Sequence, residues 1–337
     1  MMTTIGSKIS GRIAVLLPCY NEEVAIGLTV AGFRRALPTA TIYVYDNNST
    51  DRTKIVARDA GAVVRTEYIQ GKGNVVRRMF ADVEADVYVL ADGDATYDAS
   101  AAPLMVRLLI EDRLDMIVGC RSSHTEQSAY RTGHRLGNRL LTGLLMFLFG
   151  RAFSDILSGY RVFSRRFVKS FPALSRGFEI ETEISIHALE LRMPVGETMT
   201  MYAARPKGST SKLSTFRDGW RILRTMVDLY RIERPIPFFG VISAVLFATA
   251  IVLAIPIVLT YLETGLVPRF PTAILATGLV LLSSMNLFAG LILDTVVRGR
   301  QEVRRLAYLM HGCEPALPDT QILASSLEHP VSVKLEN

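Results

Sequence analysis

The chain has 337 residues, which is enough for a full α/β domain and a smaller second region. Its hydrophobic fraction of 49% and mean hydropathy of +0.26 are high for a wholly soluble protein, and its net charge of +6 suits anionic partners such as nucleic acid, phospholipid or a phosphorylated substrate. The three cysteines lack CxxC or histidine-rich spacing, so neither a disulfide framework nor a zinc site is expected.

From residue 12 to about 205, short apolar runs alternate with helical patterns. The expected strands are Ile13–Pro18, Thr41–Tyr45, Ala62–Thr66, Val87–Leu90 and Met116–Val118. The expected helices are Glu22–Leu37, Asp51–Ala60, Lys72–Glu84 and Ala102–Asp112. Apolar strands separated by helices predict an α/β fold with a mostly parallel sheet covered on both faces. Ligands of such sheets bind at the carboxyl ends of the strands, so the residues there are the first candidates for a site.

Two aspartates around a glycine, Asp92-Gly93-Asp94, directly follow the apolar run Val87–Leu90. At the end of a strand both carboxylates can approach a divalent cation with no side chain between them. Mg²⁺ or Mn²⁺ bound there would bridge to a substrate diphosphate. Many such triplets are only turns, so the position after a strand carries this prediction.

Two other segments could contact a nucleotide. Asp46 ends the second strand and could accept hydrogen bonds from a base or a ribose, or it could cap a helix, a task that Thr50 or Asp51 could also perform. Gly71-Lys72-Gly73 is expected to form a flexible cationic turn before a helix. This turn could contact a diphosphate, or it could be a plain loop without a ligand. Neither the P-loop spacing nor GxGxxG is present.

The composition changes at Pro237. Phe238–Tyr261 is 24 residues without a charge and Pro271–Leu293 is 23, so each can cross a hydrocarbon core about 30 Å thick. The first run has 14 Leu, Ile, Val and Phe residues, which favour insertion by roughly 4 to 8 kcal/mol. We expect a transmembrane hairpin within residues 237–294, and the alternative is a buried hairpin of a soluble core. Asn286 could bond another helix, within this hairpin or between subunits.

Arginines crowd on both flanks of this hairpin. They are Arg217, Arg221, Arg224, Arg231 and Arg234 before it and Arg298, Arg300, Arg304 and Arg305 after it. The connecting loop carries only Arg269, and the first apolar run of the chain is too short for a signal peptide. The positive-inside rule therefore predicts an integral membrane protein with both termini and the α/β domain in the cytoplasm.

The flanking segments complete the expected domain organisation. We expect residues 1–205 to form the α/β domain, 206–236 a basic amphipathic segment, 237–294 the hairpin and 295–337 a cytoplasmic tail. Phe216–Arg234 is expected to lie among the lipid headgroups or, alternatively, to pack on its own domain. His134–Gly150 fits an interfacial helix and a core helix equally well.

The motifs taken together resemble a known family. Pro18-Cys19-Tyr20-Asn21-Glu22-Glu23, Asp46-Asn47-Asn48-Ser49-Thr50-Asp51, Gly71-Lys72-Gly73 and Asp92-Gly93-Asp94 follow one another as in family 2 glycosyltransferases with the A-type nucleotide-sugar fold. Asp155-Ile156-Leu157-Ser158-Gly159-Tyr160-Arg161, Gly177-Phe178-Glu179 and Arg205-Pro206-Lys207-Gly208-Ser209-Thr210-Ser211-Lys212 are similar to signatures of dolichol- and polyprenyl-phosphate sugar synthases. The resemblance covers roughly residues 12–235, and the hairpin suits the bacterial two-span members.

The resemblance implies roles for individual residues. The nucleotide sugar and the acceptor would be bound by Pro18, Tyr20, Asn21, Glu22, Asp46, Lys72, Asp92, Arg161, Glu179 and Ser211. Mg²⁺ or Mn²⁺ would be held by Asp92 and Asp94, and the catalytic set would be Asp94, Asp155, Arg205 and Lys212. Asp155 would orient the acceptor substrate or basic side chains; alternatively, it could cap a helix or be a buried hydrogen-bond acceptor. For Glu179, Glu181 and Glu183, the alternative to a site role is that they are acids in the first turn of a helix. Many relatives read D-A-D where this chain has D-G-D, which weakens any transfer of donor identity.

The implied reaction is transfer of a hexose, with inversion, from a UDP- or GDP-linked donor to a polyprenyl or dolichyl phosphate. A lipid monophosphate has a second pKa near 6 and is largely dianionic at pH 7, so the departing diphosphate is the larger electrostatic task. A processive polysaccharide synthase is an alternative, but the Q-x-x-R-W motif and additional spans are missing from the sequence. A non-catalytic membrane scaffold is another alternative. Nucleic-acid binding is not expected, and a homo-oligomer stays open.

Overall fold

A computed structural model of the chain describes residues 11–121, 153–177, 179–206, 220, 223–224, 227–228 and 230–311. The chain divides into two compact units. The first comprises residues 1–222 and 304–337, and the second comprises residues 223–303. Parts of Phe216–Arg234 (residues 216–219, 221–222, 225–226 and 229) and all of His134–Gly150 lie outside the described residues, so the two expectations for these segments stay predictions.

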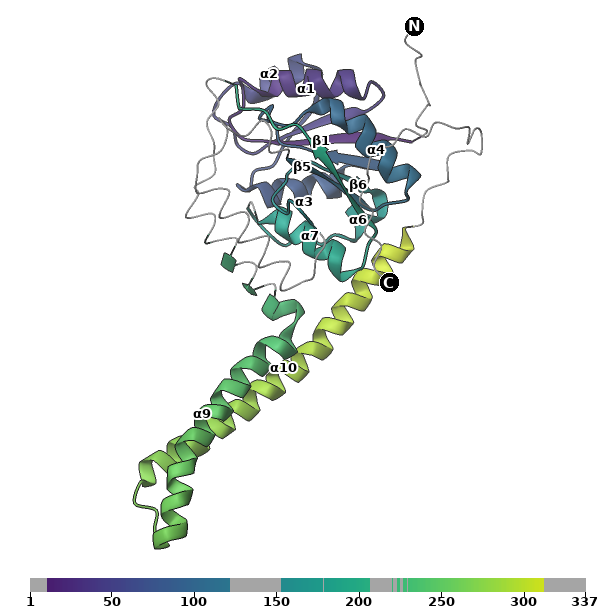
Figure 1. Cartoon of the computed structure of the whole chain (residues 1–337). Helices are drawn as coiled ribbons and strands as arrows, with labels where there is room; N and C mark the ends of the chain where they lie inside the picture. Colours follow the sequence, from purple (N-terminus) through teal and green to yellow (C-terminus); the bar gives the residue numbers. More distant parts are fainter. Residues whose placement is uncertain are drawn as a thin grey trace. The chain divides into compact units, whose positions relative to one another are not determined.

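The first unit is built on a seven-stranded sheet (Figure 1). Its strands are β1 (Ile13–Cys19), β2 (Thr41–Asp46), β3 (Val63–Thr66), β4 (Val87–Leu90), β5 (Met116–Arg121), β6 (Arg161–Ser164) and β7 (Val195–Thr200). Their order is β3-β2-β1-β4-β6-β5-β7, and β6 runs antiparallel to both of its neighbours, β4 and β5. The other pairs are parallel. The predicted α/β fold with a mostly parallel sheet is confirmed.

Helices cover both faces of this sheet. They are α1 (Ile26–Ala36), α2 (Thr53–Asp59), α3 (Lys72–Asp82), the 3₁₀ turn η1 (Ala99–Ala101), α4 (Ala102–Glu111), α6 (Arg165–Ser170) and α7 (Ile180–Glu190). The β1-α1-β2 and β3-α3-β4 connections travel in opposite directions across the sheet. Because such crossovers are right-handed, α1 and α3 lie on opposite faces. Figure 1 shows α1, α2 and α4 on one face and α3, α6 and α7 on the other.

The core of the domain has a different character on each face. On the α1 side, aliphatic strand residues such as Val15, Leu17 and Val89 pack with Val30 and Phe33 of α1, and all are at most 1% exposed. Each such side chain contributes about 1.5 to 3 kcal/mol by burial. The other face holds a cluster of aromatic rings with centroid separations of 4.8 to 6.4 Å, formed by Phe80, Tyr88, Phe163, Phe167 and Phe171. This packing fixes the strand ends on which the site stands.

The predicted elements differ from the structure mainly at their ends. Each expected strand and helix is present, but the first helix begins at Ile26 rather than Glu22 because the residues between them form a turn in which Glu22 accepts from Ala25 and Ile26. Strands β6 and β7 and helix α6 were not anticipated, and the helix α7 was considered only through its first-turn acids. They follow the long segment after β5, where the strand–helix alternation of the sequence is weakest.

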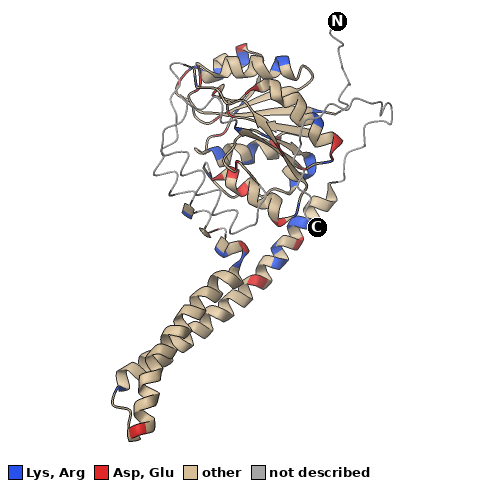
Figure 2. Ribbon diagram, in the orientation of Figure 1, with Lys and Arg blue, Asp and Glu red and all other residues tan. Residues whose placement is uncertain are grey.

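The second unit contains the hairpin of α9 (Pro235–Thr264) and α10 (Phe270–Met310), and the residues of α10 from 304 onward belong to the first unit. Gly265 ends α9 in the left-handed conformation at φ 66°. Both helices are long and apolar enough to cross a membrane. Only 11% and 17% of their most apolar 18-residue stretches is buried, whereas the core helix of a soluble protein is mostly buried. Figure 2 shows charged residues near the ends of the hairpin and almost none between. α10 continues to Met310, although residues from 295 were expected to form a tail.

The hairpin packs along a narrow seam of mostly small residues. Apart from Pro235, its buried positions recur every seven residues: Ser243, Ala250 and Ile257 on α9, and Ala276, Ser283, Gly290 and Val297 on α10. Ser243 and Ser283 each donate to the other's backbone carbonyl at 2.9 Å. The amide of Asn286 instead donates to Leu282 in its own helix at 2.8 Å. The expected hairpin contact is therefore supplied by serines, and not by Asn286.

Candidate active site

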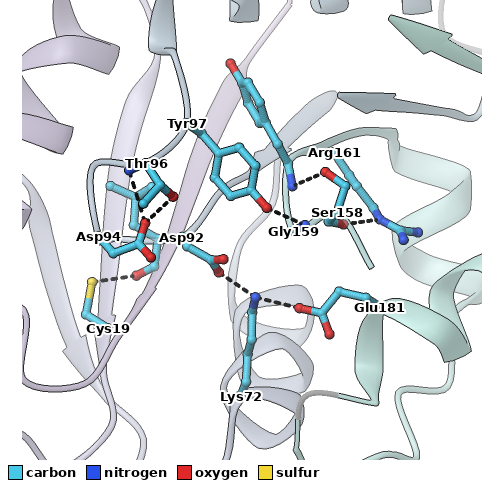
Figure 3. A network of polar contacts seen from close by, with 12 residues as sticks. Cys19, Lys72, Asp92, Asp94, Thr96, Tyr97, Ser158, Gly159, Arg161 and Glu181 are labelled. Atoms are coloured by element: carbon cyan, nitrogen blue, oxygen red, sulfur yellow. Dashed lines mark hydrogen bonds and ion pairs between the residues drawn. The ribbon is translucent and has the colours of Figure 1, made fainter. Parts of the chain in front are cut away.

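The Asp92-Gly93-Asp94 turn stands at the carboxyl end of β4, and Figure 3 shows its surroundings. A Cβ on Gly93 would lie 2.3 Å from the sulfur of buried Cys19, so only glycine allows the turn to pack against β1. Asp94 accepts hydrogen bonds from the hydroxyl and the backbone N–H of Thr96 at 2.6 and 3.2 Å. The turn is thereby fixed with Asp94 buried and the Asp92 side chain 31% exposed.

Asp94 also forms an ion pair with Arg205, at 2.6 Å between Oδ2 and Nη2. An isolated β-bridge positions the segment that carries Arg205. In this bridge Tyr97 pairs with Tyr202, and Ala203 N–H donates to the Thr96 carbonyl. Burial and the charge of Asp92 raise the pKa of Asp94, and Arg205 and Thr96 offset only part of that rise. A further positive charge beside Asp94 would therefore favour its ionised form.

Lys72, at the start of α3, reaches across to Asp92 and Glu181 (Figure 3). Its Nζ lies 2.5 Å from Glu181 Oε1 and closer still to Asp92 Oδ1. Burial alone would lower the pKa of Lys72, but the charges of Asp92 and Glu181 outweigh burial and raise that pKa. A Cβ on Gly159 would lie 2.9 Å from Asp92 Oδ2 and 3.1 Å from Lys72 Nζ, so the loop before β6 closes over this pair.

The ends of β1 and β2 form the neighbouring part of the same edge. Asp46 is fully buried, and its Oδ2 accepts from Ser49 N–H at 3.1 Å and lies 3.2 Å from Lys54 Nζ. Its Oδ1 has no partner in the described part of the chain. Asn21 ties the two strand ends together, since its N–H donates to Ser49 and its side chain accepts from Thr50 N–H.

The remaining residues expected to bind a nucleotide lie around these strand ends. Glu22 is buried and lies 3.5 Å from Arg205. Tyr20 is 37% exposed, and Pro18 is the penultimate residue of β1. Asn47 accepts from Gly71 N–H at 2.7 Å, which fixes the approach of the Lys72 loop to β2. The strand ends thus gather the sequence motifs at one edge of the sheet.

Asp155 forms a bidentate pair with Arg121, the last residue of β5, at 2.7 and 2.8 Å. Burial would raise the pKa of Asp155, but the hydrogen bonds and the charge of Arg121 outweigh burial and lower it. The guanidinium of Arg121 also lies 5.6 Å from the ring centroid of Tyr202. Asp155 is therefore an ionised group that orients Arg121.

Arg161 has a different environment from the one predicted for a substrate-binding residue. It is completely buried, and it donates to the carbonyls of Ile156 and Ser158 and to the hydroxyl of Ser185. These bonds hold the loop that precedes β6. Its place in the motif is explained by this loop, and the structure gives no support to a substrate contact.

For three other expected site residues, the described part of the chain shows no contact with the rest of the candidate site. The Glu179 carboxylate folds back to accept from Gly177 N–H at 3.2 Å and does not cap α7. Ser211 and Lys212 lie outside the described residues. Their predicted roles at the donor and acceptor phosphates stay predictions.

Two residues that sequence reasoning missed belong to this edge, Glu181 and Arg121. Glu181 was weighed only as an acid in the first turn of a helix, and nothing local indicates that it meets Lys72, 109 positions earlier. Arg121 follows an apolar strand, and its position at a carboxyl end was the one available signal.

The end of β4 fits a hard divalent cation. Such ions are held by one or two carboxylates together with substrate phosphates and water, and Asp92 and Asp94 supply the two carboxylates. Within the described ranges no group of three or more Asp, Glu, His or Cys forms a complete cage. Burial and the charge of Asp92 raise the pKa of Asp94, and a cation would offset the second of these causes. Asp92 and Asp94 are therefore the residues that would hold it.

Comparison with known proteins points to one family. Residues 14–171 match the glycosyl transferase family 2 domain. Glycosyltransferase AglJ of Haloferax volcanii is 30% identical over 299 residues, which cover 88% of this chain and 98% of AglJ. The dolichyl-phosphate hexose transferase of the same organism is 28% identical over 222 residues, covering 66% of this chain and 95% of that protein.

A likeness to solved structures supports the same fold. The Mycobacterium tuberculosis glucosyl-3-phosphoglycerate synthase in complex with Mn²⁺, uridine diphosphate and phosphoglyceric acid aligns with a TM-score of 0.56 and 20% identity. The alignment covers 66% of this chain and 79% of that one. At this identity the likeness shows the shared A-type fold and nothing further about the substrates of this chain.

Proposed function

Because the chain belongs to glycosyl transferase family 2 and is a glycosyltransferase that uses a nucleotide sugar, we propose that it transfers a hexose to a polyprenyl or dolichyl phosphate at a membrane surface. The donor would be a UDP- or GDP-linked hexose, and the product a lipid-phosphate-linked sugar with an inverted anomeric centre. The active domain would face the cytoplasm, and both ends of the hairpin would lie on that side.

One observation carries this proposal: each carboxylate of the Asp-Gly-Asp turn meets a basic side chain from a distant segment. Lys72 pairs with Asp92 and Arg205 with Asp94, and Arg121 stands at the end of β5 on the same edge. An edge that holds basic side chains beside a carboxylate pair able to take a cation can bind a donor diphosphate and an acceptor phosphate together. A membrane scaffold that only retained the fold would have no need of this arrangement.

Residues of this edge can perform the displacement without a strong base. An oxygen of the dianionic acceptor phosphate attacks the anomeric carbon, and the bond to the nucleoside diphosphate breaks with its electron pair leaving on the diphosphate. Lys72 and Arg205 would stabilise that developing charge. A divalent cation held by Asp92 and Asp94 would supply further charge neutralisation. The lowered pKa of Asp155 suits a residue that orients Arg121 toward the acceptor phosphate rather than one that removes a proton.

The lipid nature of the acceptor is supported by the hairpin and by one relative. Two helices of the chain are long and apolar enough to cross a bilayer. The similarity to a dolichyl-phosphate hexose transferase extends over two thirds of the chain. A polyprenyl chain would hold the acceptor phosphate at the membrane surface, where an anchored enzyme meets it by lateral diffusion.

The proposal is tested with the full-length protein in liposomes that contain polyprenyl phosphate. A panel of radiolabelled UDP- and GDP-linked hexoses is supplied with Mg²⁺ or Mn²⁺, and the lipids are extracted and counted. We expect label from one donor in a lipid that releases its sugar under mild acid. Liposomes without polyprenyl phosphate are the control. Label that enters a water-soluble product or a neutral lipid from every active donor would overturn the acceptor assignment.

A further inference from the structure

The last turns of α10 contact the α/β domain through a buried polar cluster. We call it the α10 clamp: Asp115, Arg166 and Glu190 of the domain, with Arg304 and Tyr308 of α10. All five residues belong to the same compact unit. The α10 clamp shares no residue with the candidate active site, and no sequence motif marked it.

Asp115 is the centre of the α10 clamp. Its carboxylate is fully buried and accepts from Tyr308 Oη at 2.8 Å, from Ser164 Oγ at 2.7 Å and from Arg166 Nε. The guanidinium of Arg166 lies 5.0 Å from the ring centroid of Tyr308. A buried carboxylate that loses one partner is left partly unsatisfied, so Tyr308 is held in place by hydrogen bonding as well as by packing.

A second ion pair lies one turn earlier on α10. Arg304 Nη1 is 2.6 Å from Glu190 Oε2, and their side chains are 15% and 7% exposed. Pairs this well buried are screened little by salt and fix geometry more firmly than surface pairs. Arg304 and Tyr308 are four residues apart, so they share one face of α10. That face is therefore docked through two independent buried contacts.

The elements held by the α10 clamp also reach the candidate active site. β5 runs from Met116, next to Asp115, to Arg121, and α7 runs from the site residue Glu181 to Glu190. β6 also connects the two clusters. It begins after the loop that contains Asp155 and ends at Ser164, whose hydroxyl donates a hydrogen bond to Asp115. Six residues of strand or eleven of helix span about 16 to 20 Å. The two clusters thus lie at opposite ends of the same rigid elements.

We propose that the α10 clamp is a positioning device that fixes the catalytic domain to the helix of the second candidate span, so that Arg121 meets an acceptor phosphate presented by the bilayer. The inference rests on the proposed function for its acceptor. The clamp residues do not touch substrate. Loosening the clamp leaves the chemistry intact, and it impairs the encounter with an acceptor whose height is set by the membrane.

The test compares two acceptors with the full chain carrying Tyr308→Phe and Arg304→Gln. We expect transfer to a long polyprenyl phosphate in liposomes to fall tenfold or more. Transfer to a short, water-soluble prenyl phosphate in detergent should change by less than twofold, with an unchanged donor KM. The matched control is Arg305→Gln, at the exposed neighbour of Arg304. An equal loss with both acceptors, or no loss with either, would overturn the inference.

A charge reversal guards against simple misfolding. Arg304→Glu should reproduce the selective loss, and adding Glu190→Arg should restore transfer in liposomes. Failure of the double variant to recover, in protein that still binds donor nucleotide by calorimetry, would contradict a role for this pair.

A readout without any acceptor separates this inference from the proposed function. Spin labels at Leu104→Cys on the domain and Leu281→Cys on α10, with Cys313→Ser, report their distance distribution in liposomes. The distribution should broaden in the Tyr308→Phe, Arg304→Gln protein and stay narrow in the Arg305→Gln control. An unchanged distance distribution would contradict the proposed positioning role of the α10 clamp. Activity toward neither acceptor in the wild-type protein would overturn the proposed function alone.

Discussion

The carboxyl edge of the sheet and the α9–α10 hairpin are specified in opposite ways. At the edge, Asn21, Asn48 and Ala95 follow β1, β2 and β4 with φ of 52°, 62° and 59°, a region that non-glycine residues seldom occupy. Individual hydrogen bonds and close approaches hold those turns. The hairpin is helical on both sides of Gly265, with one internal proline at Pro256, and most of its buried positions repeat every seven residues. Three of the six non-glycine residues with positive φ in the described ranges therefore lie at the candidate site.

This difference determines how each region should respond to substitution. At the edge a single atom decides whether two charged groups meet, so small changes should affect turnover far more than stability. In the hairpin many equivalent contacts share the energy, so one substitution should have a modest effect. Five predictions test that contrast, and the largest effect comes first.

Asp94→Asn should reduce sugar transfer by about 10³-fold or more, because several kcal/mol of charge stabilisation would be lost with the cation site. Asp98→Asn, at the half-buried cap of η1, is the matched control and should retain activity. Radiolabel transfer to extracted lipid at saturating donor and metal measures both. Full activity of the Asp94→Asn enzyme would contradict the metal assignment.

Gly93→Ala should lower kcat by about 10²-fold, since the new Cβ would displace the turn by a large part of an ångström. Adding Cys19→Ala removes the sulfur that the Cβ meets at 2.3 Å, and activity should largely return. Steady-state kinetics of the single and double variants measure the effect. If Cys19→Ala gives no recovery, the close approach is not the reason for the glycine.

Glu181→Gln should lower kcat/KM for the donor by roughly tenfold, because Lys72 would lose one of the two carboxylates that orient it. Lipid binding should not change. Glu111→Gln, an exposed acid on α4, serves as the control. Equal kinetics for the Glu181 and Glu111 variants would remove Glu181 from the site.

His187 should make the α/β domain less stable in acid. Burial and the charge of Arg304 lower its pKa to about 3, whereas an unfolded histidine titrates near 6.5. Above pH 6.5 both states are neutral. As pH falls from 6.5 toward 3 the unfolded state gains a proton that the folded state excludes, so stability falls by up to about 1.4 kcal/mol per pH unit.

The measurement is the thermal midpoint between pH 7.5 and 4.5, in wild type and in His187→Gln. Other groups titrate in both proteins, so the difference isolates His187. The wild-type midpoint should fall further than that of the variant. Parallel curves would show that His187 does not exclude the proton.

Ser283→Ala should have the smallest effect, about 0.6 kcal/mol of hairpin stability, because interhelical hydrogen bonds in membranes contribute roughly that much. Ser284→Ala is its control, since that hydroxyl bonds Val280 in its own helix. Unfolding in mixed detergent micelles compares them. A loss of several kcal/mol would mean that the hairpin, like the carboxyl edge, depends on single contacts.

Sequence reasoning found what is local in the chain. The strand ends at Asp46 and Asp92 and the two apolar helices were predictable because hydrophobic runs and the polar residues that end them are adjacent in sequence. Glu181 was not, since its meeting with Lys72 depends on the placement of α7. Arg161 shows the opposite error: a motif states that a residue is required, but not whether its side chain faces a ligand or the core.

Gly159 illustrates a constraint that no list of functional groups would contain. The space beside it is filled by the carboxylate of Asp92 and the ammonium of Lys72, at 2.9 and 3.1 Å from where a Cβ would be. In a library of all single substitutions this position should tolerate as little as the aspartates do. A tolerance map of the enzyme would therefore mark the residues that leave room for the reaction together with those that take part in it.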